Sequence, residues 1–323
     1  MKIAVDAMGG DRAPDVIIEA VEGSELRDYV VLIGDESKLQ DKVSTGVEVV
    51  HAPEVIGMDE HPTEAFRKKK NSSIGIGTEL QKQGKVDAFI GAGNTGAYMA
   101  FATLGLGRLK GVERPALATF FPTKKGYTLV LDVGANTSVK PTHLFQFGTM
   151  GSLYVEKITG KENPSVALLS MGEEDTKGDS LTLKAFELMK ESSLNFVGNI
   201  EGHHILEGNV DVVVCEGTVG NAILKFGESV VEITQEAIRD IVKTSLRAKL
   251  GGFLLRPSLK SFFARMSYDE YGGAVLLGVN GITVVCHGRS SPKAIRNAIR
   301  MAAKCVKENI NSHIEKRIKE FSQ

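Results

Sequence analysis

Residues 88–107 read AFIGAGNTGAYMAFATLGLG, an uncharged run as long as a membrane-spanning helix. Its five glycines and the central Asn94 and Thr95 argue against a lipid-spanning helix and favour a buried strand, a tight turn and a helix. Within the turn, Gly91, Gly93 and Gly96 have the G-x-G-x-x-G/A spacing of a dinucleotide-binding loop. The stretch therefore predicts a βα unit and poses the question of which ligand its turn binds.

Short β-rich apolar runs alternate with helix-like segments along the rest of the chain. Segments 141–158 and 179–193 have helical period and length, and one long amphipathic helix is predicted from Pro292 onward, with Ser291 as its N-cap. The alternation predicts one doubly wound α/β domain over 1–323, with a mainly parallel sheet. The predicted strands are 3–8, 29–34, 47–52, 88–92, 117–122, 128–133, 165–171, 195–200, 211–217 and 282–288.

Composition narrows the function classes. The 323 residues are 42% apolar and 24% charged, as in ordinary soluble globular proteins. A formal net charge of −1 argues against general electrostatic binding of nucleic acid, so no nucleic-acid partner is expected. Three cysteines without metal-ligand spacing predict neither a disulfide framework nor a metal site, and a reduced cytosolic setting fits. The N-terminus does not have the pattern of a secretory signal.

Six of the predicted strands run into loops rich in glycine and asparagine. In an open α/β sheet, ligands bind beyond the carboxyl ends of the strands, where helix N-termini direct N–H groups outward. We expect the six loops to converge on one crevice that binds an anion, although tight-turn chemistry alone explains any single loop. Their candidate side chains are Asp11, Asn94, Thr95, Asn136, Lys140, Lys177, Asn221, His287 and Ser290, with Gly9 and Gly10 in the first loop.

The dinucleotide interpretation of the glycine turn fits its spacing but not its context. A Rossmann fingerprint normally lies in the first βα turn, and here that turn, AMGGDRAP (7–14), lacks the pattern. Glu113 lies at about the right distance for the ribose-binding acid, but it precedes the next strand instead of ending it. A nicotinamide-dependent dehydrogenase on the same fold is therefore the alternative enzyme, and no cofactor is expected in the favoured interpretation.

Familiar nucleophile and metal motifs are missing from the sequence, which has no G-x-S-x-G and no H-E-x-x-H. Cys215 ends a strand and is interpreted as a small apolar residue. The adjacent His203 and His204 are interpreted as surface residues. His287 ends a strand just before the last helix, and catalytic and structural roles are about equally open for it.

Two basic segments could contact an acidic partner or a membrane. FRKKKNSS (66–73) contributes Arg67, Lys68, Lys69 and Lys70. The segment 241–268 has no acidic residue, and Gly251-Gly252 and Pro257 are predicted to break it into two short helices with an apolar, basic tip. Such a hairpin suits an anionic membrane surface, with packing against a second subunit as the alternative. Its candidate contacts are Arg247, Lys249, Phe253, Leu254, Leu255, Arg256 and Lys260.

Taken in order, eight motifs of this chain resemble the bacterial phosphate acyltransferase family, from residue 1 to about residue 300. One departure follows the DVVV strand, where the family pattern has Asp-Gly-Phe and this chain has Glu216-Gly217-Thr218. The motifs are MKIAVDAMGGD, RKKKNSS, GAGNTGA, LDVGAN, MGEEDTKG, FVGNIEG, DVVVCEGTVGNA and EYGGAVLLGVNG followed by HGRSS.

The resemblance implies a Rossmann-like three-layer α/β/α fold, related to isocitrate dehydrogenase and phosphotransacetylase, with a protruding helical hairpin. It implies a cytoplasmic homodimer that associates peripherally with the inner face of the cell membrane. The implied reaction moves a long-chain fatty acyl group from acyl carrier protein to inorganic phosphate. The acyl phosphate product would supply a membrane glycerol-phosphate acyltransferase in phospholipid synthesis.

Residues and resemblance together give a mechanistic hypothesis. Backbone N–H groups from Gly93 to Gly96 cradle phosphate, one oxygen of which attacks the thioester directly, without a covalent acyl-enzyme. Lys177, His287 and Asn221 are the candidate catalytic residues. A non-catalytic membrane-surface scaffold is the alternative outside the enzyme class. The candidate phosphate and substrate contacts are Gly9, Gly10, Asp11, Gly93, Asn94, Thr95, Gly96, Asn136 and Lys140.

Overall fold

A computed structural model describes residues 1–266 and 268–321, apart from the side chains of Arg265 and Tyr268, so these positions of the predicted hairpin lie outside the described part. Within it, one sheet of eleven strands has the order β3-β2-β1-β4-β11-β10-β5-β6-β9-β7-β8. The strands are β1 Ile3–Asp6, β2 Val30–Gly34, β3 Glu48–His51, β4 Ala88–Gly91, β5 Ala116–Thr123, β6 Gly126–Leu131, β7 Val166–Leu169, β8 Phe196–Ile200, β9 Val212–Val214, β10 Ala274–Leu277 and β11 Ile282–Val285.

Most strand pairs are parallel, as predicted, but the sheet reverses direction in its middle. Strands β3, β2, β1, β4 and β11 are mutually parallel, and so are β6, β9, β7 and β8. Between these groups β10 pairs antiparallel with both β11 and β5, and β5 pairs antiparallel with β6. All ten predicted strands are confirmed, with ends shifted by up to three residues, whereas β10 was not predicted.

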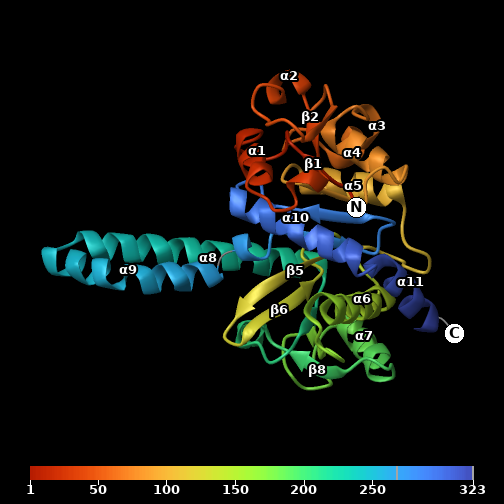
Figure 1. Ribbon diagram of the computed structural model, residues 1–323. Helices are drawn as coiled ribbons and strands as arrows, with labels where there is room; N and C mark the ends of the chain where they lie inside the picture. The colour runs from red at the N-terminus through yellow and green to blue at the C-terminus, as the bar shows by residue number, and fades with distance from the viewer. Residues whose placement is uncertain (267, 322–323) are drawn as a thin grey trace.

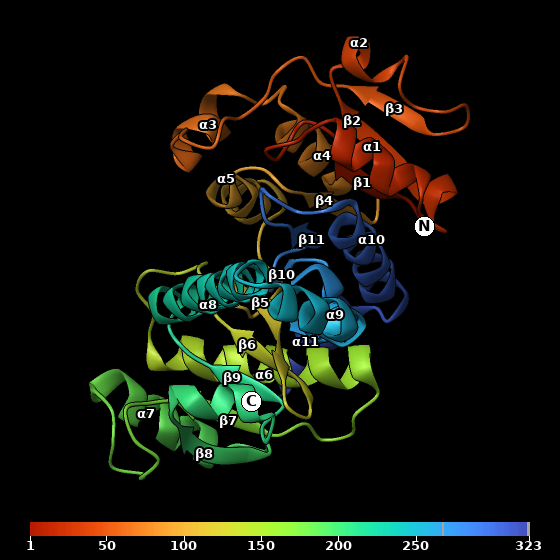
Figure 2. The ribbon, with the colours of Figure 1, turned by 90° about the vertical axis from the view of Figure 1, so that its left-hand side faces the viewer.

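Helices cover both faces of the sheet and give the predicted three layers (Figures 1 and 2). One buried cluster packs under α1, α6, α7, α10 and α11, and a second packs under α4, α5 and the start of α8. No helix in the described part of the chain has both the length and the apolar character needed to cross a membrane. The helices of the body are α1 Asp15–Glu22, α2 Glu36–Leu39, α3 Pro62–Lys68, α4 Ser73–Lys82, α5 Thr95–Phe101, α6 Pro141–Thr159, α7 Ser180–Lys190, α10 Pro292–Lys307 and α11 Ile310–Phe321, with a 3-10 helix η3 at Gly202–Glu207.

The protruding hairpin is longer than predicted, and its turn lies elsewhere. Helix α8 (Gly217–Lys243) leaves the body, and α9 (Leu246–Met266) returns along it (Figure 1). The predicted breaks at Gly251-Gly252 and Pro257 are wrong, because α9 continues through all three residues. A Cβ on Gly252 would lie 2.6 Å from Val242 Cγ1, so this glycine allows close helix packing. The turn is set instead by Ser245, whose Oγ accepts the Ala248 N–H at 3.1 Å.

The single long C-terminal helix is also a wrong prediction, since α10 and α11 are separate helices. Asn309, between them, has a left-handed φ of 48°, a conformation that asparagine tolerates better than most residues and that ends a helix. The start of α10 is as predicted: Ser291 Oγ accepts the Ala294 N–H at 3.2 Å, and Pro292 occupies the first turn.

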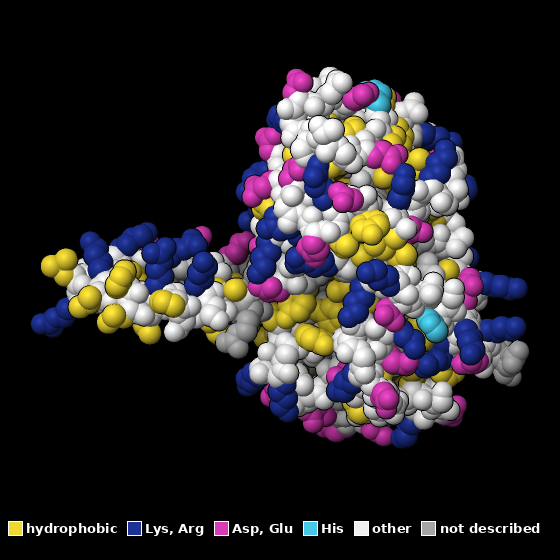
Figure 3. Space-filling model, in the orientation of Figure 1, with side chains coloured by type: hydrophobic (Ala, Val, Ile, Leu, Met, Phe, Trp, Pro, Cys, Tyr) yellow, Lys and Arg dark blue, Asp and Glu magenta, His cyan; other side chains and the backbone are white. Residues whose placement is uncertain are grey.

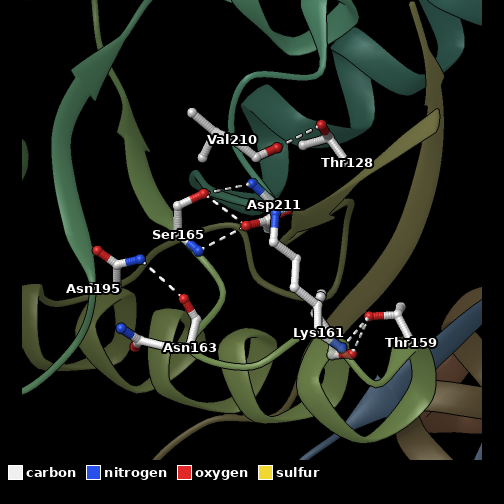
Figure 4. A network of polar contacts seen from close by, with 9 residues as sticks. Thr128, Thr159, Lys161, Asn163, Ser165, Asn195, Val210 and Asp211 are labelled. Carbon is white, nitrogen blue, oxygen red and sulfur yellow. Dashed lines mark hydrogen bonds and ion pairs between the residues drawn. The ribbon is translucent and has the colours of Figure 1, made fainter. Parts of the chain in front are cut away.

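A polar network fixes the amino ends of β7 and β9 (Figure 4). Asp211 accepts from Lys161 Nζ at 2.7 Å and from the backbone N–H and hydroxyl of Ser165, both at 2.8 Å. The neighbouring Val210 carbonyl accepts from the Thr128 hydroxyl at 2.7 Å. Partial burial raises the pKa of Asp211, but the hydrogen bonds from Lys161 and Ser165 outweigh it and leave the pKa below its usual range.

We expect Asp211→Asn to lower the free energy of unfolding by about 1–3 kcal/mol at neutral pH, because the partly buried donors of Ser165 and the exposed Lys161 lose a charged acceptor. The pKa of Asp211 is lower in the folded chain than in the unfolded chain, so the unfolded chain binds more protons. The contribution of ionised Asp211 to the free energy of unfolding is therefore fully present above the unfolded pKa of about 3.9. It is lost as pH falls below that value through the folded pKa. Urea unfolding across this range measures it. Asp175→Asn, which breaks the exposed pair with Lys190, is the control and should cost at most about 1 kcal/mol.

Candidate active site

Loops after β1, β4 and β11 form a first loop cluster (7–12, 92–96 and 286–290). The Asp11 N–H donates to the Gly288 carbonyl at 2.9 Å, and Arg12 donates to the Ser290 carbonyl at 3.2 Å. A Cβ on Gly9 would lie 2.7 Å from the Gly93 nitrogen, so the first and second loops are in backbone contact. The structure thus brings together the predicted residues of three loops, including Gly9, Gly10, Asp11 and His287.

The glycines of the GAGNTGA turn are explained by contacts within the protein. A Cβ on Gly91 would lie 1.6 Å from the Tyr98 hydroxyl oxygen, and one on Gly96 would lie 2.5 Å from Pro62 Cγ. A Cβ on Gly93 would lie 3.4 Å from the Gly9 Cα. Since the loop 7–12 lies where a pyrophosphate would approach the second glycine of a dinucleotide turn, this geometry argues against NAD at this turn.

The side chain of Asn94 is hydrogen-bonded to a further loop, residues 57–60. Its side-chain NH₂ donates to the carbonyls of Gly57, Met58 and Glu60 at 3.0–3.1 Å, and its oxygen accepts the Ala97 N–H at 3.0 Å. The side chain of Asn94, predicted to contact phosphate, thus forms an N-cap that positions 57–60. The N–H groups of Thr95 and Gly96, in the first turn of α5, have no acceptor within their helix and are the donors that remain for a ligand.

The basic run 67–70 lies at the same loop. Lys69 donates to the Val55 carbonyl at 2.9 Å and to Glu60 at 2.6 Å, so it ties 55–60 to α3. Lys68 forms an exposed pair with Glu64. Arg67 and Lys70 are exposed, and they are the members of the run that present charge to solvent beside the cluster.

Beneath the first loop cluster lies the buried carboxylate of Asp6. Its carboxylate accepts from the Tyr98 hydroxyl and from the Met8 N–H, the latter at 2.9 Å. Burial raises the pKa of Asp6, and burial together with the Asp6 charge raises the pKa of Tyr98. This pair joins β1 to α5 and fixes the loops above it.

Loops after β6, β7 and β9 form a second loop cluster (132–137, 170–179 and 215–221), organised by Asp132. This buried carboxylate accepts N–H groups of Leu117, Gly134, Ala135 and Asn136 at 2.8–3.1 Å. Asn136 donates from its side chain to Asp132 and to the Pro115 carbonyl, both at 2.8 Å. The amide donors of Asn136, predicted to contact phosphate, are thus committed to the loop. Burial raises the pKa of Asp132, which these hydrogen bonds oppose.

A cavity of about 360 Å³ opens in the second loop cluster, lined by Ser170, Met171, Asp179, Cys215, Glu216 and Val219 among others. The loop that carries Lys177 is held by Asn199, which donates to the Glu174 carbonyl at 3.0 Å. Lys177 itself is exposed. Lys140, at the start of α6, is also exposed, and its N–H donates to His143 Nδ1 at 3.0 Å.

Helix α8 connects the two clusters. It begins in the second, where a Cβ on Gly134 would lie 3.5 Å from Asn221, and its face Asn221-Lys225-Glu228-Glu232 leads to the first. Glu232 pairs with Arg289 at 2.9 Å, and Glu228 lies 2.9 Å from Lys225 Nζ. The prediction of one crevice for six loops is corrected: three loops gather at each end of this face. Lys177 and Asn221 belong to one end and His287 to the other.

His287 lies against this face of α8. Its Nδ1 accepts the Arg289 N–H at 3.1 Å, so the proton of the neutral ring is on Nε2, which lies 4.0 Å from Glu228. Burial lowers the pKa of His287, with repulsion from Lys225 and Arg289 acting in the same direction and Glu228 opposing. Lys225 and Glu228 were not predicted, although their spacing from Asn221 by four and seven residues marks one helix face.

The described residues contain no group of three or more His, Cys, Asp or Glu side chains arranged to bind a metal ion. All three cysteines are buried. Burial, together with the nearby Asp132 and Glu216, raises the pKa of the Cys215 thiol far above its usual value, so the thiol stays protonated.

Solved structures with this fold include enzymes of two kinds. A branched-chain phosphotransacylase from Enterococcus faecalis superposes with a TM-score of 0.61 over 95% of this chain and 99% of its own, at 15% identity. A 4-hydroxythreonine-4-phosphate dehydrogenase from Klebsiella pneumoniae gives 0.53 over 94% and 99%, also at 15% identity. The α/β fold of this chain is therefore one that a solved phosphotransacylase and a solved dehydrogenase also have.

Sequence relatives resolve the choice between these two kinds of enzyme. A phosphate acyltransferase from Pelotomaculum thermopropionicum is 49% identical over 98% of this chain and 95% of its own length. One from Heliobacterium modesticaldum is 48% identical over 98% of each. A family model described as fatty acid synthesis protein matches residues 1–313. The chain belongs to this family, and it is an enzyme of the acyltransferase class.

Proposed function

We propose that this enzyme transfers a long-chain fatty acyl group from acyl carrier protein to inorganic phosphate. The observation that carries the proposal is a group of cationic side chains around the half-buried, neutral His287. Lys225 and Arg289 are close enough to lower its pKa by repulsion, and Arg12 donates a hydrogen bond to the carbonyl of Ser290 in the same loop. Cations favour a phosphate dianion, and the Nε2–H of His287 can donate to one of its oxygens. Thr95 and Gly96 in the same cluster contribute N–H groups.

The reaction proceeds by direct attack. A phosphate oxygen forms a bond to the thioester carbonyl carbon, and the carbonyl oxygen becomes the oxyanion. The oxyanion then re-forms the C=O bond as the C–S bond breaks, and the released pantetheine thiolate takes up the proton lost by the phosphate. The buried, protonated thiol of Cys215 is unsuited to forming an acyl-enzyme, which supports the direct route. Lys177 and Asn221, at the second loop cluster, are assigned to the pantetheine side of the thioester donor. Abolished turnover in a folded Cys215→Ala variant would contradict this scheme.

The function is tested by incubating the protein with palmitoyl-acyl carrier protein and inorganic phosphate. Mass spectrometry should detect palmitoyl phosphate and free carrier protein in equal amounts, and only when phosphate is present. A thermal-shift assay separates the rival function: phosphate should stabilise the protein and NAD should not. Stabilisation by NAD alone, with no acyl phosphate, would favour the dehydrogenase. Liposome binding without acyl transfer, and with no effect of Lys177→Ala beyond stability, would favour the scaffold.

The α8–α9 hairpin is proposed to place the enzyme on the inner face of the cytoplasmic membrane. Leu246, Phe253 and Leu254 are 84%, 70% and 69% exposed. In Figure 3 hydrophobic side chains occupy the end and one side of the hairpin, and Lys and Arg line the other side. Insertion of the apolar side with cations at the headgroups would bring the product to a membrane glycerol-phosphate acyltransferase. The exposed Ile233 and Ile241 of α8 suit packing in a homodimer, and the basic side suits acidic carrier protein.

We expect the double change Phe253→Glu with Leu254→Glu to reduce sedimentation with anionic liposomes at least about tenfold, because each carboxylate must enter the interface. Turnover of acyl carrier protein substrate without liposomes should be unaffected. Val197→Glu, an exposed apolar position on the edge strand β8, is the matched control and should bind liposomes as the unchanged protein does. Equal binding by both variants would contradict the membrane proposal.

A further inference from the structure

A large apolar groove opens where the hairpin leaves the body, outside both loop clusters. It has a volume of about 830 Å³ and is bordered by β5, the 3-10 helix η3, α8 and Met266 of α9. Figure 3 shows hydrophobic side chains gathered at the base of the hairpin. Protein pockets of roughly 300–1,000 Å³ hold organic ligands of substantial size.

Some residues that line the groove belong to the hydrophobic core, and others are exposed to solvent. Phe121 and Ile205, which are buried, and the partly buried Ile223 belong to the core on this face of the sheet. Phe226 of α8 and Leu206 of η3 line the groove while remaining 72% and 48% exposed. Their exposure leaves apolar surface that a hydrocarbon would cover.

The groove reaches the candidate active site through α8. Glu228 and Glu232 line it, and the same two residues face His287 and Arg289 of the first loop cluster. Both acids are paired with cations at 2.9 Å, so the end of the groove next to His287 carries paired charges while the rest is apolar. One helix therefore presents a polar face to the reacting groups and an apolar face to the groove.

We propose that this groove binds the fatty acyl chain of the thioester donor, with the carbonyl carbon at the Glu228 end and the hydrocarbon running between α8, β5 and η3. The inference rests on the proposed function and names the subsite that selects a long chain. Each methylene group that the groove covers should raise affinity about fourfold, until its length is filled. A second copy of this chain is the competing occupant.

Gly227 provides a way to fill the groove without disturbing the fold. It lines the groove, and a Cβ there would meet nothing within 4 Å. Gly227→Phe should lower kcat/KM for palmitoyl-acyl carrier protein at least about tenfold, and leave the butyryl substrate within about twofold. Gly251→Phe is the matched control, since a Cβ on this α9 glycine also meets nothing within 4 Å, and it should change neither value. Equal losses for both substrates, or no loss for palmitoyl, would overturn the inference.

Direct binding separates this inference from the proposed function. The sequence contains no tryptophan, so Phe226→Trp introduces a single fluorescent probe into the groove. A pantetheine thioester of dibrominated stearic acid should quench it, while Phe145→Trp, which lies against Phe321, should not be quenched. Quenching without acyl phosphate formation would refute the function and retain the groove. Acyl phosphate formation without quenching, with Gly227→Phe converting a dimer to monomers, would assign the groove to a second copy.

Discussion

Replacing His287 with alanine should lower kcat/KM for acyl transfer to phosphate by about 10²- to 10³-fold, the range seen when one pre-positioned donor is removed. The loss follows from the Nε2–H, which the hydrogen bond from the Arg289 N–H to Nδ1 directs toward α8. Lys225→Met should also lower kcat/KM, chiefly by raising the KM for phosphate, because it removes a cation close to His287.

The pH dependence follows from the lowered pKa of His287. The ring is neutral at neutral pH, and protonation would place a proton on Nδ1, which could then no longer accept the Arg289 N–H that orients the ring. Activity should therefore fall only as pH drops through the lowered pKa, below the usual value of about 6.5. His313→Ala, on the exposed side of α11, is the control. A folded His287→Ala enzyme within about threefold of the unchanged enzyme would remove His287 from the mechanism.

Gly220→Ala should destabilise the protein by about 3 kcal/mol or more, because the added Cβ would lie 1.9 Å from the Asp132 carbonyl oxygen and 2.9 Å from Cys215 Sγ. The contact is with backbone at the centre of the second loop cluster, so neither partner can move without breaking the hydrogen bonds of Asp132.

The same substitution seven residues further along α8 has the opposite expected sign. Gly227→Ala meets nothing within 4 Å and should stabilise the helix by up to about 1 kcal/mol. Urea unfolding of both variants measures the difference directly. Similar effects of the two changes would show that helix propensity, and not the contact at Asp132, decides the result.

The sequence predicts the strands well because most are continuous apolar runs with turn residues at both ends. It misses β10, whose four residues stand between Gly272-Gly273 and Gly278. It pairs antiparallel with β11, the next strand along the chain, and with β5, which is distant in sequence and which no local pattern specifies. The hairpin turn was misplaced because Gly252 and Pro257 are usually helix breakers, and the packing of α8 against α9 overrides that preference.

The candidate site could be predicted as a set of loops but not as a geometry. Asn94 and Asn136 stand where ligand-binding residues are expected, yet their side chains hold backbone carbonyls of other loops. Those carbonyls come from 57–60 and Pro115, segments without a recognisable motif. The partner of His287 is likewise remote in sequence: Glu228 lies on a helix that begins at the opposite cluster.

The position of β11 has a consequence for the order of synthesis. Residues 282–285 pair with β4 (88–91), and residues 274–277 join β11 to β5 (116–123). A growing chain that has made the strands on both sides, from β1 to β9, still lacks the two strands between β4 and β5. These strands are left with unpaired edges until this late segment leaves the ribosome. The nascent chain should therefore need protection from aggregation for most of its translation.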